Sequence, residues 1–472
     1  MYLGTQMIVE NLRIARRILV IALFMALSIL CLSPPGVNAQ GAKTRIEQKP
    51  NPKANREFGL AMLRLVKKVL KDNYYDPTFH GINIDERFKA AEAEIKTEDR
   101  RWQINRTIAQ ILLDLNDSHT AYYPPEKLFS VDYGFSMMMM GGSCYVVNVK
   151  KHSNAETKGI TPGDEIVEIN GLDPKKDSLW VIYYIINRLD PQDNLNIKLR
   201  KLDNTIQEIT VEAKFLSQDE QEKQFKEMKN DNQIKPYACS EISQELIACK
   251  LRTFVAEGAV IDKMMKEVGV HKKFILDLRG NRGGIVDTEE RLTGYFFDHD
   301  VKIFTERRRN GTKDKIAKSH GDKAFGGEVS VLIDSRSASA SEIFARVIQI
   351  EKRGKIIGDV SDGAVMESYQ IPLSPDFYDY WTRFTVAEMS VTIADLIMSD
   401  GGRLEGKGVI PDVPVFPNRV ALSKRLDPVL AYAAQLMGSP ISAQKAGDLH
   451  FLIPKEVDPS STESDKKKKK DQ

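Results

Sequence analysis

The strongest constraint on the fold is an alternation of apolar runs and helix-like runs over residues 234–435. Strand-like runs such as FILDLR, VSVLID and KIIGD are separated by helix-like runs such as VIDKMMKEV, EERLTGYFF and SEIFARVIQI. Such alternation is typical of βαβ units, in which a helix carries the chain back to begin the next parallel strand. The pattern predicts an α/β core with a partly parallel sheet.

Other segments flank this core. Residues 40–54 are polar with two prolines and are interpreted as a linker. Residues 55–130 carry apolar residues at three- and four-residue intervals, which predicts a helical N-terminal domain. Residues 131–215 combine short strands with Pro-Gly and Asn-Gly turns, and residues 216–233 form a charged connector. Residues 436–472 end in a lysine run, and we expect the last part of this tail to be disordered.

Residues 1–39 have the composition of a targeting segment. Arginines precede the apolar stretch Ile18–Leu32, and the small residues Val37 and Ala39 follow it. This order predicts a secretory signal peptide or, if it is retained, an N-terminal membrane anchor. We therefore expect an exported protein in the periplasm or another extracytoplasmic compartment.

Export would permit disulfides, and Cys239 and Cys249 flank a candidate hairpin. The sequence leaves open whether these two cysteines are bridged or remain buried thiols. The net charge of +2 gives no indication of a nucleic acid partner. The seven histidines do not cluster with cysteines or carboxylates, so we expect no metal site and no cofactor. The oligomeric state is left unassigned.

The run DSRSASASEIFARV places serines before a helix-like segment. Ser339 and Glu342 form a capping-box pattern, which explains a serine there without any chemistry. However, Ser339 also follows an apolar strand, where a hydroxyl can lie beside the free amides of a helix start. A second turn, LDLRGNRGG, supplies Gly283 and Gly284, whose missing side chains allow a backbone amide to approach a substrate.

Taken in order, LDLRGNRGG, VSVLIDSRSASASEIFA, IIGD and EGKGVIPDVPV resemble one family, the C-terminal processing (tail-specific) serine peptidases. The resemblance covers about residues 55–435. It implies a multidomain α/β protein with a crotonase/ClpP-like peptidase core, a helical N-terminal domain and an inserted PDZ domain. It also implies that Ser339 is the nucleophile, with an oxyanion hole from the amide of Ala340 and that of Gly283 or Gly284.

The PDZ resemblance spans residues 131–215, where Gly159, Pro162-Gly163-Asp164 and Ile169-Asn170-Gly171 lie where that family places them. It implies a peptide-carboxylate loop at Tyr133, Gly134, Phe135 and Ser136. In such a loop, consecutive amides bind a terminal carboxylate while the peptide adds a strand to the sheet edge. The expected partners are therefore polypeptide substrates with exposed C-termini. Alternate members of Met137–Met140 are interpreted as core residues.

The common form of the peptidase family uses a serine–lysine dyad, but Ala364 stands at the lysine position. Lys352 and Lys355 are nearby in sequence and are expected to face solvent. A lysine-dyad enzyme that recruits one of them stays open as an alternative.

The NDSHT segment supplies another base. Ser118-His119 resembles the tricorn-core branch of the family, in which the base is a histidine oriented by the adjacent serine and a glutamate. Glu405 matches that glutamate by motif, and Glu367 is a weaker alternative. An imidazole has a pKa near neutrality and suits this task.

The sequence thus predicts an exported serine endopeptidase of Ser-His type. The rival hypothesis is a catalytically inactive scaffold that binds peptide tails or an apolar ligand.

Overall fold

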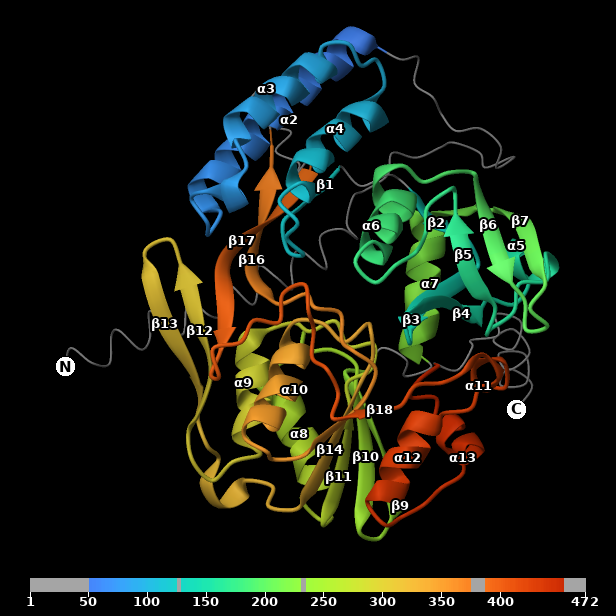
Figure 1. Ribbon diagram of the computed structural model, residues 1–472, viewed down its shortest axis with the longest axis vertical. Helices are drawn as coiled ribbons and strands as arrows, with labels where there is room; N and C mark the ends of the chain where they lie inside the picture. Colours follow the sequence, from blue (N-terminus) through green and yellow to red (C-terminus); the bar gives the residue numbers. More distant parts are fainter. Residues whose placement is uncertain (1–50, 125–128, 231–234, 375–386, 454–472) are drawn as a thin grey trace, which may run out of the picture. The chain divides into compact units, whose positions relative to one another are not determined.

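The structure is a computed structural model that describes residues 51–124, 129–230, 235–374 and 387–453 (Figure 1). The predicted signal or anchor segment, most of the predicted linker and the lysine-rich end of the tail lie outside these residues. Within the described ranges, no helix has the length and apolar character needed to cross a membrane.

A six-stranded sheet forms the core, in the order β18-β15-β14-β11-β10-β9. Its strands are β9 (Tyr237–Ser243), β10 (Leu246–Leu251), β11 (Lys273–Asp277), β14 (Glu328–Ile333), β15 (Lys355–Gly358) and β18 (Val413–Pro414). Strands β10, β11, β14, β15 and β18 pair in parallel, and β9 pairs antiparallel to β10 at the edge. This arrangement agrees with the partly parallel sheet that the alternating runs predict.

Helices cover both faces of this sheet. The helices are α8 (Gly258–Val268), α9 (Val286–Gly294), α10 (Ala340–Ile350), α12 (Pro428–Leu436) and α13 (Ala443–Gly447). Because side chains alternate along a strand, β10 turns Ile247 toward one hydrophobic cluster and Ala248 toward another. The first cluster contains α8, α9 and α10, and the second contains α12 and α13.

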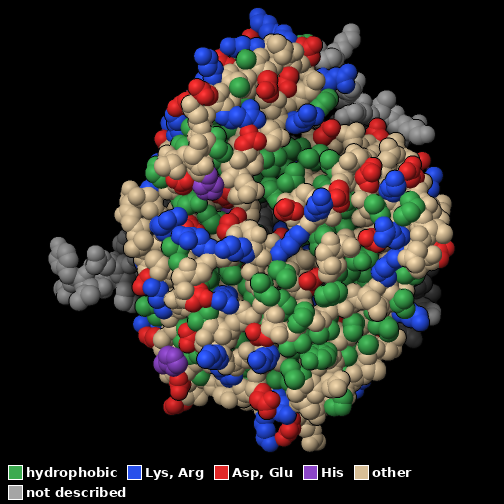
Figure 2. All heavy atoms as spheres, viewed as in Figure 1, with side chains coloured by type: hydrophobic (Ala, Val, Ile, Leu, Met, Phe, Trp, Pro, Cys, Tyr) green, Lys and Arg blue, Asp and Glu red, His purple; other side chains and the backbone are tan. Residues whose placement is uncertain are grey.

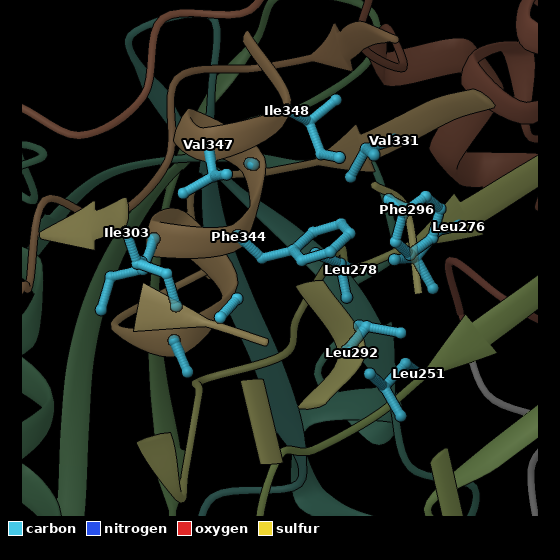
Figure 3. Close-up of a cluster of buried hydrophobic side chains, with 14 of the residues drawn as sticks. Leu251, Leu276, Leu278, Leu292, Phe296, Ile303, Val331, Phe344, Val347 and Ile348 are labelled. Atoms are coloured by element: carbon cyan, nitrogen blue, oxygen red, sulfur yellow. The ribbon is translucent and has the colours of Figure 1, made fainter. Parts of the chain in front are cut away.

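Helix α10 is held firmly in the first cluster. Figure 3 shows Phe344 pointing into the cluster near Leu278 and Phe296, and the rings of Phe344 and Phe296 lie 5.2 Å apart edge to face. Burying each large apolar side chain contributes about 1.5–3 kcal/mol. This packing fixes the start of α10, where Ser339 lies.

A second sheet joins the core to the helical N-terminal region. Its strands are β1 (Ala121–Tyr123), β12 (Val301–Arg308), β13 (Gly311–Ala317), β16 (Met366–Leu373) and β17 (Ala387–Met398). Strand β17 pairs antiparallel with β1, β12 and β16. Figure 1 shows β16 and β17 running from the core toward the N-terminal helices. The β1–β17 pairing brings the chain just after His119 onto the core.

The N-terminal helices pack as their periodicity predicts. They are α2 (Pro52–Asn73), α3 (Ile84–Ile95) and α4 (Arg101–Leu113), with a short 3₁₀ turn at Phe79–Gly81. The side chain of Asn51 accepts a hydrogen bond from the Ala54 amide and starts α2, with proline at its first position. Their apolar faces share one cluster with β1, β16 and β17.

An antiparallel five-stranded sheet, β3-β4-β5-β6-β7, lies between the helical region and the core in sequence. Its strands are β3 (Phe135–Met140), β4 (Ser143–Val149), β5 (Glu165–Ile169), β6 (Asn194–Arg200) and β7 (Ile206–Glu212), with α5 (Asn154–Thr157), α6 (Leu179–Tyr184) and a π-helical turn (Ile185–Leu189). Strands β2 (Phe129–Asp132) and β8 (Lys214–Ser217) pair where the chain enters and leaves this unit. The charged segment that follows forms helix α7 (Gln218–Asn230).

All four methionines of Met137–Met140 are buried, on two sides of the sheet. Met137 and Met139 belong to the core of the five-stranded unit, as expected for alternate members. Met138 and Met140 pack against Leu422 and the C-terminal residues Leu452 and Ile453. Ordered packing therefore continues well beyond the boundary predicted at residue 435.

The C-terminal helices leave apolar side chains exposed. Figure 2 shows hydrophobic side chains gathered over the region that Figure 1 assigns to α11 (Arg419–Ser423) and α12. The exposed members on these helices are Val420, Tyr432 and Leu436.

Cys239 and Cys249 form a disulfide between the directly paired strands β9 and β10. The alternative of two buried thiols, which the sequence left open, is thus not what the structure shows. Cys144 is a buried free thiol.

A buried carboxyl group in α9 makes stability depend on pH. Burial raises the pKa of Glu289 from 4.5 to about 8, and one of its oxygens has no hydrogen-bond partner among the described residues. The protonated form is therefore favoured by folding, and its stabilising contribution is lost as the pH rises through about 8. We expect urea unfolding to show that the free energy of unfolding falls less between pH 5 and 9 in Glu289→Gln than in the wild type. Equal pH dependence in both proteins would contradict this assignment.

Candidate active site

Ser339 lies in the loop between β14 and α10, directly before the helix. Its backbone has φ 55° and ψ −121°, a left-handed conformation that is strained for a residue with a side chain and costs about 1–3 kcal/mol. Its hydroxyl makes no hydrogen bond within the described residues, so it does not cap the helix. The strained turn leaves the Ser339 hydroxyl available for chemistry.

The carboxylate of Glu342 holds the loop that follows β15 against the start of α10. One oxygen accepts hydrogen bonds from the Ser361 hydroxyl (2.6 Å) and the Gly363 amide (2.7 Å), and the other from the amides of Ser339 and Ala364 (3.0 Å each). Burial raises the pKa of Glu342 to about 7, although these hydrogen bonds oppose the shift. The capping-box pattern predicted only the bond to Ser339; the other three come from residues 19 to 22 positions away.

Gly283 leaves no room for a side chain beside Ser339. It has φ +88°, and a Cβ atom built on it would lie 2.7 Å from the Cβ of Ser339 and 2.9 Å from the amide nitrogen of Ala340. The neighbouring Gly284 has φ +146° and is packed against the Val255 backbone. Both glycines are required by backbone conformation and close approach.

The three amides predicted for an oxyanion hole are not equivalent. The Gly283 amide donates to the Asn281 side chain at 2.9 Å. The amides of Ala340 and Gly284 donate to no acceptor within the described residues. Asn281 also binds the Leu251 carbonyl through its side chain, and its own carbonyl accepts from the Ser341 hydroxyl. In this state, therefore, the Gly283 amide is engaged, whereas the amides of Ala340 and Gly284 remain available among the described residues.

Buried charged side chains hold the start of the loop that carries Gly283 and Gly284. Arg279 binds Asp277 and Asp427 through both sides of its guanidinium, at 2.6 to 2.8 Å for the shortest contacts. Lys250 donates to Asp277 and to the Arg279 carbonyl. Removing one partner from such a buried group typically costs about 3–5 kcal/mol. The network fixes the end of β11, from which the loop to Gly283 begins.

We expect Gly283→Ala to disable the site. The added methyl group would collide with Ser339 at a backbone angle unfavourable for alanine, so catalytic rate should fall at least about 100-fold and stability by about 1–3 kcal/mol. Gly171→Ala is the matched control, since Gly171 has φ +82° but no atom within 4 Å of an added Cβ. Equal loss of activity in the two variants, measured by steady-state kinetics and thermal unfolding, would contradict the role of this close approach.

His119 is held by its neighbours through a chain of hydrogen bonds. The Ser118 hydroxyl lies 2.7 Å from His119 Nδ1 and 2.9 Å from Glu405 Oε2. The Ser118 amide donates to Glu405 Oε1 at 2.9 Å, and the His119 amide donates to Asp117 Oδ1 at 2.8 Å. A hydroxyl has one proton, and an ionised carboxylate only accepts. Ser118 therefore donates to Glu405 and accepts from Nδ1–H, which leaves Nε2 as a free base.

The surroundings of His119 favour its neutral form. Burial lowers the pKa of His119, and the charge of Arg282 lowers it further, whereas the Asp117 carboxylate opposes both. Burial also raises the pKa of Glu405, against the hydrogen bonds from Ser118 and Val365. A neutral imidazole at neutral pH is the form that can accept a proton.

One short loop links the hydrogen-bonded group of Ser118, His119 and Glu405 to Ser339. The Val365 amide donates to Glu405 Oε2 at 2.7 Å, and the preceding carbonyl, that of Ala364, accepts from the Ser339 amide at 2.9 Å. No hydrogen bond joins His119 to the Ser339 hydroxyl in the described residues.

The residues that the sequence offered as alternatives to Glu405 and to the histidine base have other surroundings. Glu367 forms an ion pair with Arg308 at 2.7 Å and not with Ser118. Lys352 and Lys355 are exposed, as predicted. Sequence reasoning missed Lys176, which lies between β5 and α6 and close enough to Glu342 and Asp362 for their charges to act on it. Its partial burial lowers its pKa, which the charges of Glu342 and Asp362 oppose.

Part of the predicted carboxylate-binding loop is already engaged in hydrogen bonds within the protein. The Tyr133 hydroxyl is buried and donates to backbone carbonyls, and the Gly134 amide donates to Asp132 at 2.9 Å. Phe135 and Ser136 are half-buried at the start of β3. In this state, the Gly134 amide is therefore not available to a terminal carboxylate.

The described residues contain no group of three or more His, Cys, Asp or Glu side chains placed to hold a metal ion.

Comparison with profiles of known protein families identifies a domain in this chain. The profile of Peptidase family S41 matches residues 248–415. The chain carries a peptidase family S41 domain. That segment contains Gly283, Ser339 and Glu405, whereas Ser118 and His119 lie before it and are brought to it by the β1–β17 pairing. The domain match agrees with the predicted resemblance to the C-terminal processing peptidases over these residues.

Two curated relatives carry the name of that group. The chain is 24% identical over 334 residues to the carboxy-terminal processing protease CtpA of Bacillus subtilis, covering 67% of this chain and 65% of the relative. It is 25% identical over 345 residues to CtpB of the same organism, covering 68% of this chain and 64% of the relative. The chain thus spans slightly less than two thirds of the length of these relatives.

A solved structure shares the fold. The structure titled "Crystal Structure of mature CPAF" matches with a TM-score of 0.61 and 12% identity, covering 86% of this chain and 99% of that chain. At this identity the likeness shows that the two chains share a fold, and it carries no statement about function.

Proposed function

We propose that the protein is an exported serine endopeptidase that cleaves unfolded or C-terminally exposed polypeptides through an acyl-enzyme. Ser339 attacks the scissile carbonyl, His119 Nε2 takes the hydroxyl proton, and Ala340 with Gly284 donates to the developing oxyanion. His119 then returns the proton to the leaving amine, and water releases the acyl group by the same steps. The observation that carries the proposal is the hydrogen-bonded chain from Glu405 through Ser118 to His119.

Several observations support this assignment of roles. Ser118 and Glu405 together fix the tautomer that leaves Nε2 unprotonated, and Glu405 can stabilise the imidazolium that forms. A side chain at Gly283 would collide with Ser339, and the Gly283 amide would join the oxyanion hole only by leaving Asn281. The disulfide between Cys239 and Cys249 supports an oxidising, extracytoplasmic location.

The five-stranded unit is proposed as a PDZ module that captures substrate tails. Strand β3 is an edge strand of its sheet, and edge strands can accept a peptide as an added strand. In this structure the Tyr183 hydroxyl accepts from the Met137 amide (3.2 Å) and donates to the Met137 carbonyl (2.9 Å). The Ser335 hydroxyl donates to the Met139 carbonyl at 2.6 Å. A bound peptide must displace both hydroxyls.

Displacement of Tyr183 can be measured directly. We expect Tyr183→Phe to bind a fluorescent C-terminal peptide several-fold more tightly. Phenylalanine cannot form the hydrogen bonds to the Met137 backbone that a peptide must replace, and each such bond is worth about 1 kcal/mol. Fluorescence anisotropy with Ser339→Ala as the background avoids cleavage. An unchanged or weaker affinity would contradict peptide addition at this edge.

The rival function is a catalytically inactive scaffold that binds peptide tails. It is favoured by the missing hydrogen bond between His119 and Ser339 and by Ala364 at the lysine position. Hydrolysis of an unfolded protein separates the two. The proposal predicts turnover by the wild type and by Lys176→Met, and loss in Ser339→Ala. Turnover that is lost in Lys176→Met would point instead to a lysine base, and no turnover in the wild type at any tail-peptide concentration would favour the scaffold.

A further inference from the structure

Arg282 carries a positive charge next to the proposed oxyanion hole. It directly precedes Gly283 and Gly284, and a side chain at Gly283 would collide with Ser339. Consecutive Cα atoms are about 3.8 Å apart, so the Cα of Arg282 lies within about 7.6 Å of that of Gly284. The Gly284 amide is one of the two available donors, and a substrate carbonyl bound there is close to Arg282.

The Arg282 guanidinium lies against the loop that follows β15. It donates to Asp362 Oδ2 at 3.1 Å, and the Asp362 amide donates to the carbonyl of Ser337, two residues before Ser339, at 2.9 Å. Burial lowers the pKa of His119, and the charge of Arg282 lowers it further. Burial raises the pKa of Tyr183, and the charge of Arg282 is one of the effects that oppose this shift. The cation thus lies near the nucleophile loop, the proposed base and α6.

Most of the hydrogen-bonding capacity of Arg282 is unused. Its side chain is 64% exposed, and its hydrogen bond in the described part of the chain is the one to Asp362. A guanidinium has five N–H donors in a planar fork, so several remain for a ligand. Such a fork matches the two oxygens of a carboxylate. Arg282 is therefore accessible and chemically suited to an acidic group.

The acidic side chains of the site are less accessible than Arg282. Glu342 and Asp117 are buried, and the Asp362 side chain is 18% exposed. Glu342 and Asp117 also accept hydrogen bonds from the protein itself. An approaching polypeptide therefore meets the positive charge of Arg282 more readily than these negative charges.

We propose that Arg282 selects polypeptides that carry an aspartate or glutamate side chain close to the scissile bond. An extended peptide advances about 3.3–3.6 Å per residue, so one arginine can contact side chains within roughly three positions of the cut. The inference rests on the proposed peptidase function and adds the substrate class on which the site acts. Because Arg282 is largely exposed, the attraction should weaken as the ionic strength rises.

Cleavage kinetics on matched peptides test the proposal. Cleavage sites in a reduced, unfolded protein are first mapped by mass spectrometry. Quenched fluorescent peptides built on one mapped site then carry Asp, Asn or Lys at each position within three residues of the cut, each with a free or an amidated C-terminus. We expect kcat/KM to be at least about fivefold higher for the best Asp peptide than for its Asn counterpart, with a smaller ratio in about 0.5 M NaCl.

Substitutions separate the charge of Arg282 from its ion pair. Arg282→Gln should bring the Asp-to-Asn ratio close to one, and Arg282→Glu should favour the Lys peptide. Asp362→Asn removes the ion pair but keeps the cation, so its ratio should equal or exceed that of the wild type. Lys176→Met is the matched control, because Lys176 is a second cation near Asp362 but donates to the Lys407 carbonyl. Its ratio should equal that of the wild type.

Failure of the charge preference and failure of the peptidase function give different results. Equal cleavage of Asp and Asn peptides by an active wild type would overturn the inference and leave the peptidase function standing. A preference that persists in Arg282→Gln, that is lost in Asp362→Asn, or that follows the terminal carboxylate and not the acidic side chain would overturn it as well. No cleavage of any peptide or unfolded protein would contradict the peptidase function, and the inference with it.

Discussion

His119→Gln is expected to lower kcat/KM by roughly 10⁴- to 10⁶-fold, about as much as Ser339→Ala. Glutamine cannot accept the proton of the Ser339 hydroxyl, so the nucleophile stays un-ionised. The double variant His119→Gln/Ser339→Ala should be no slower than either single variant, because the two residues act as one unit. Steady-state hydrolysis of an unfolded protein at neutral pH measures all three.

Lys176→Met serves as the control for the lysine alternative. Lys176 approaches the same loop, but it contacts the Lys407 carbonyl at 3.3 Å and not the proposed base. Its substitution should leave kcat/KM within a few-fold of the wild type. A loss comparable with that of Ser339→Ala, together with an active His119→Gln variant, would transfer the role of base from His119 to Lys176.

Glu405→Gln is expected to lower kcat by about 10²- to 10⁴-fold with little change in KM. Three donors point at the Glu405 carboxylate: the Ser118 amide, the Ser118 hydroxyl and the Val365 amide. The NH₂ group of glutamine must face at least one of them, so Ser118 can no longer hold the correct tautomer of His119. The same reasoning predicts that wild-type activity falls as the pH drops through the raised pKa of Glu405.

Glu367→Gln is the matched control for Glu405. Glu367, on β16, is paired with Arg308, on β12, and the described residues show no hydrogen bond between Glu367 and Ser118. Its variant should retain wild-type kcat. Comparable losses in the two glutamate variants would show that the effect of Glu405 reflects general destabilisation and not the orientation of His119.

The sequence predicted the site best where a local motif carries the chemistry. Ser339 was assigned through the family's motif order, and Ser118, His119 and Glu405 were grouped through the resemblance to the tricorn-core branch, which also lacks the lysine at the Ala364 position. The structure brings Ser118, His119 and Glu405 into direct contact. The parallel core sheet follows from periodicity in the same way.

Contacts that depend on tertiary packing could not be predicted. The capping-box pattern does not show that Glu342 also binds Ser361 and Gly363, which lie on another loop. The hydrogen bond from the Gly283 amide to the Asn281 side chain depends on backbone angles, and two consecutive glycines allow many such angles. Strands β12 and β17 pair across nearly a hundred residues, and no local pattern specifies such a partner.

The most direct test of the account is labelling of the wild-type protein with a fluorophosphonate, followed by mass-spectrometric mapping of the modified residue. The account predicts a label on Ser339 that is lost in His119→Gln and strongly reduced in Glu405→Gln, while Lys176→Met is labelled like the wild type. Labelling of Ser339 that persists without His119, or no labelling of the wild type even with a saturating tail peptide, would contradict it.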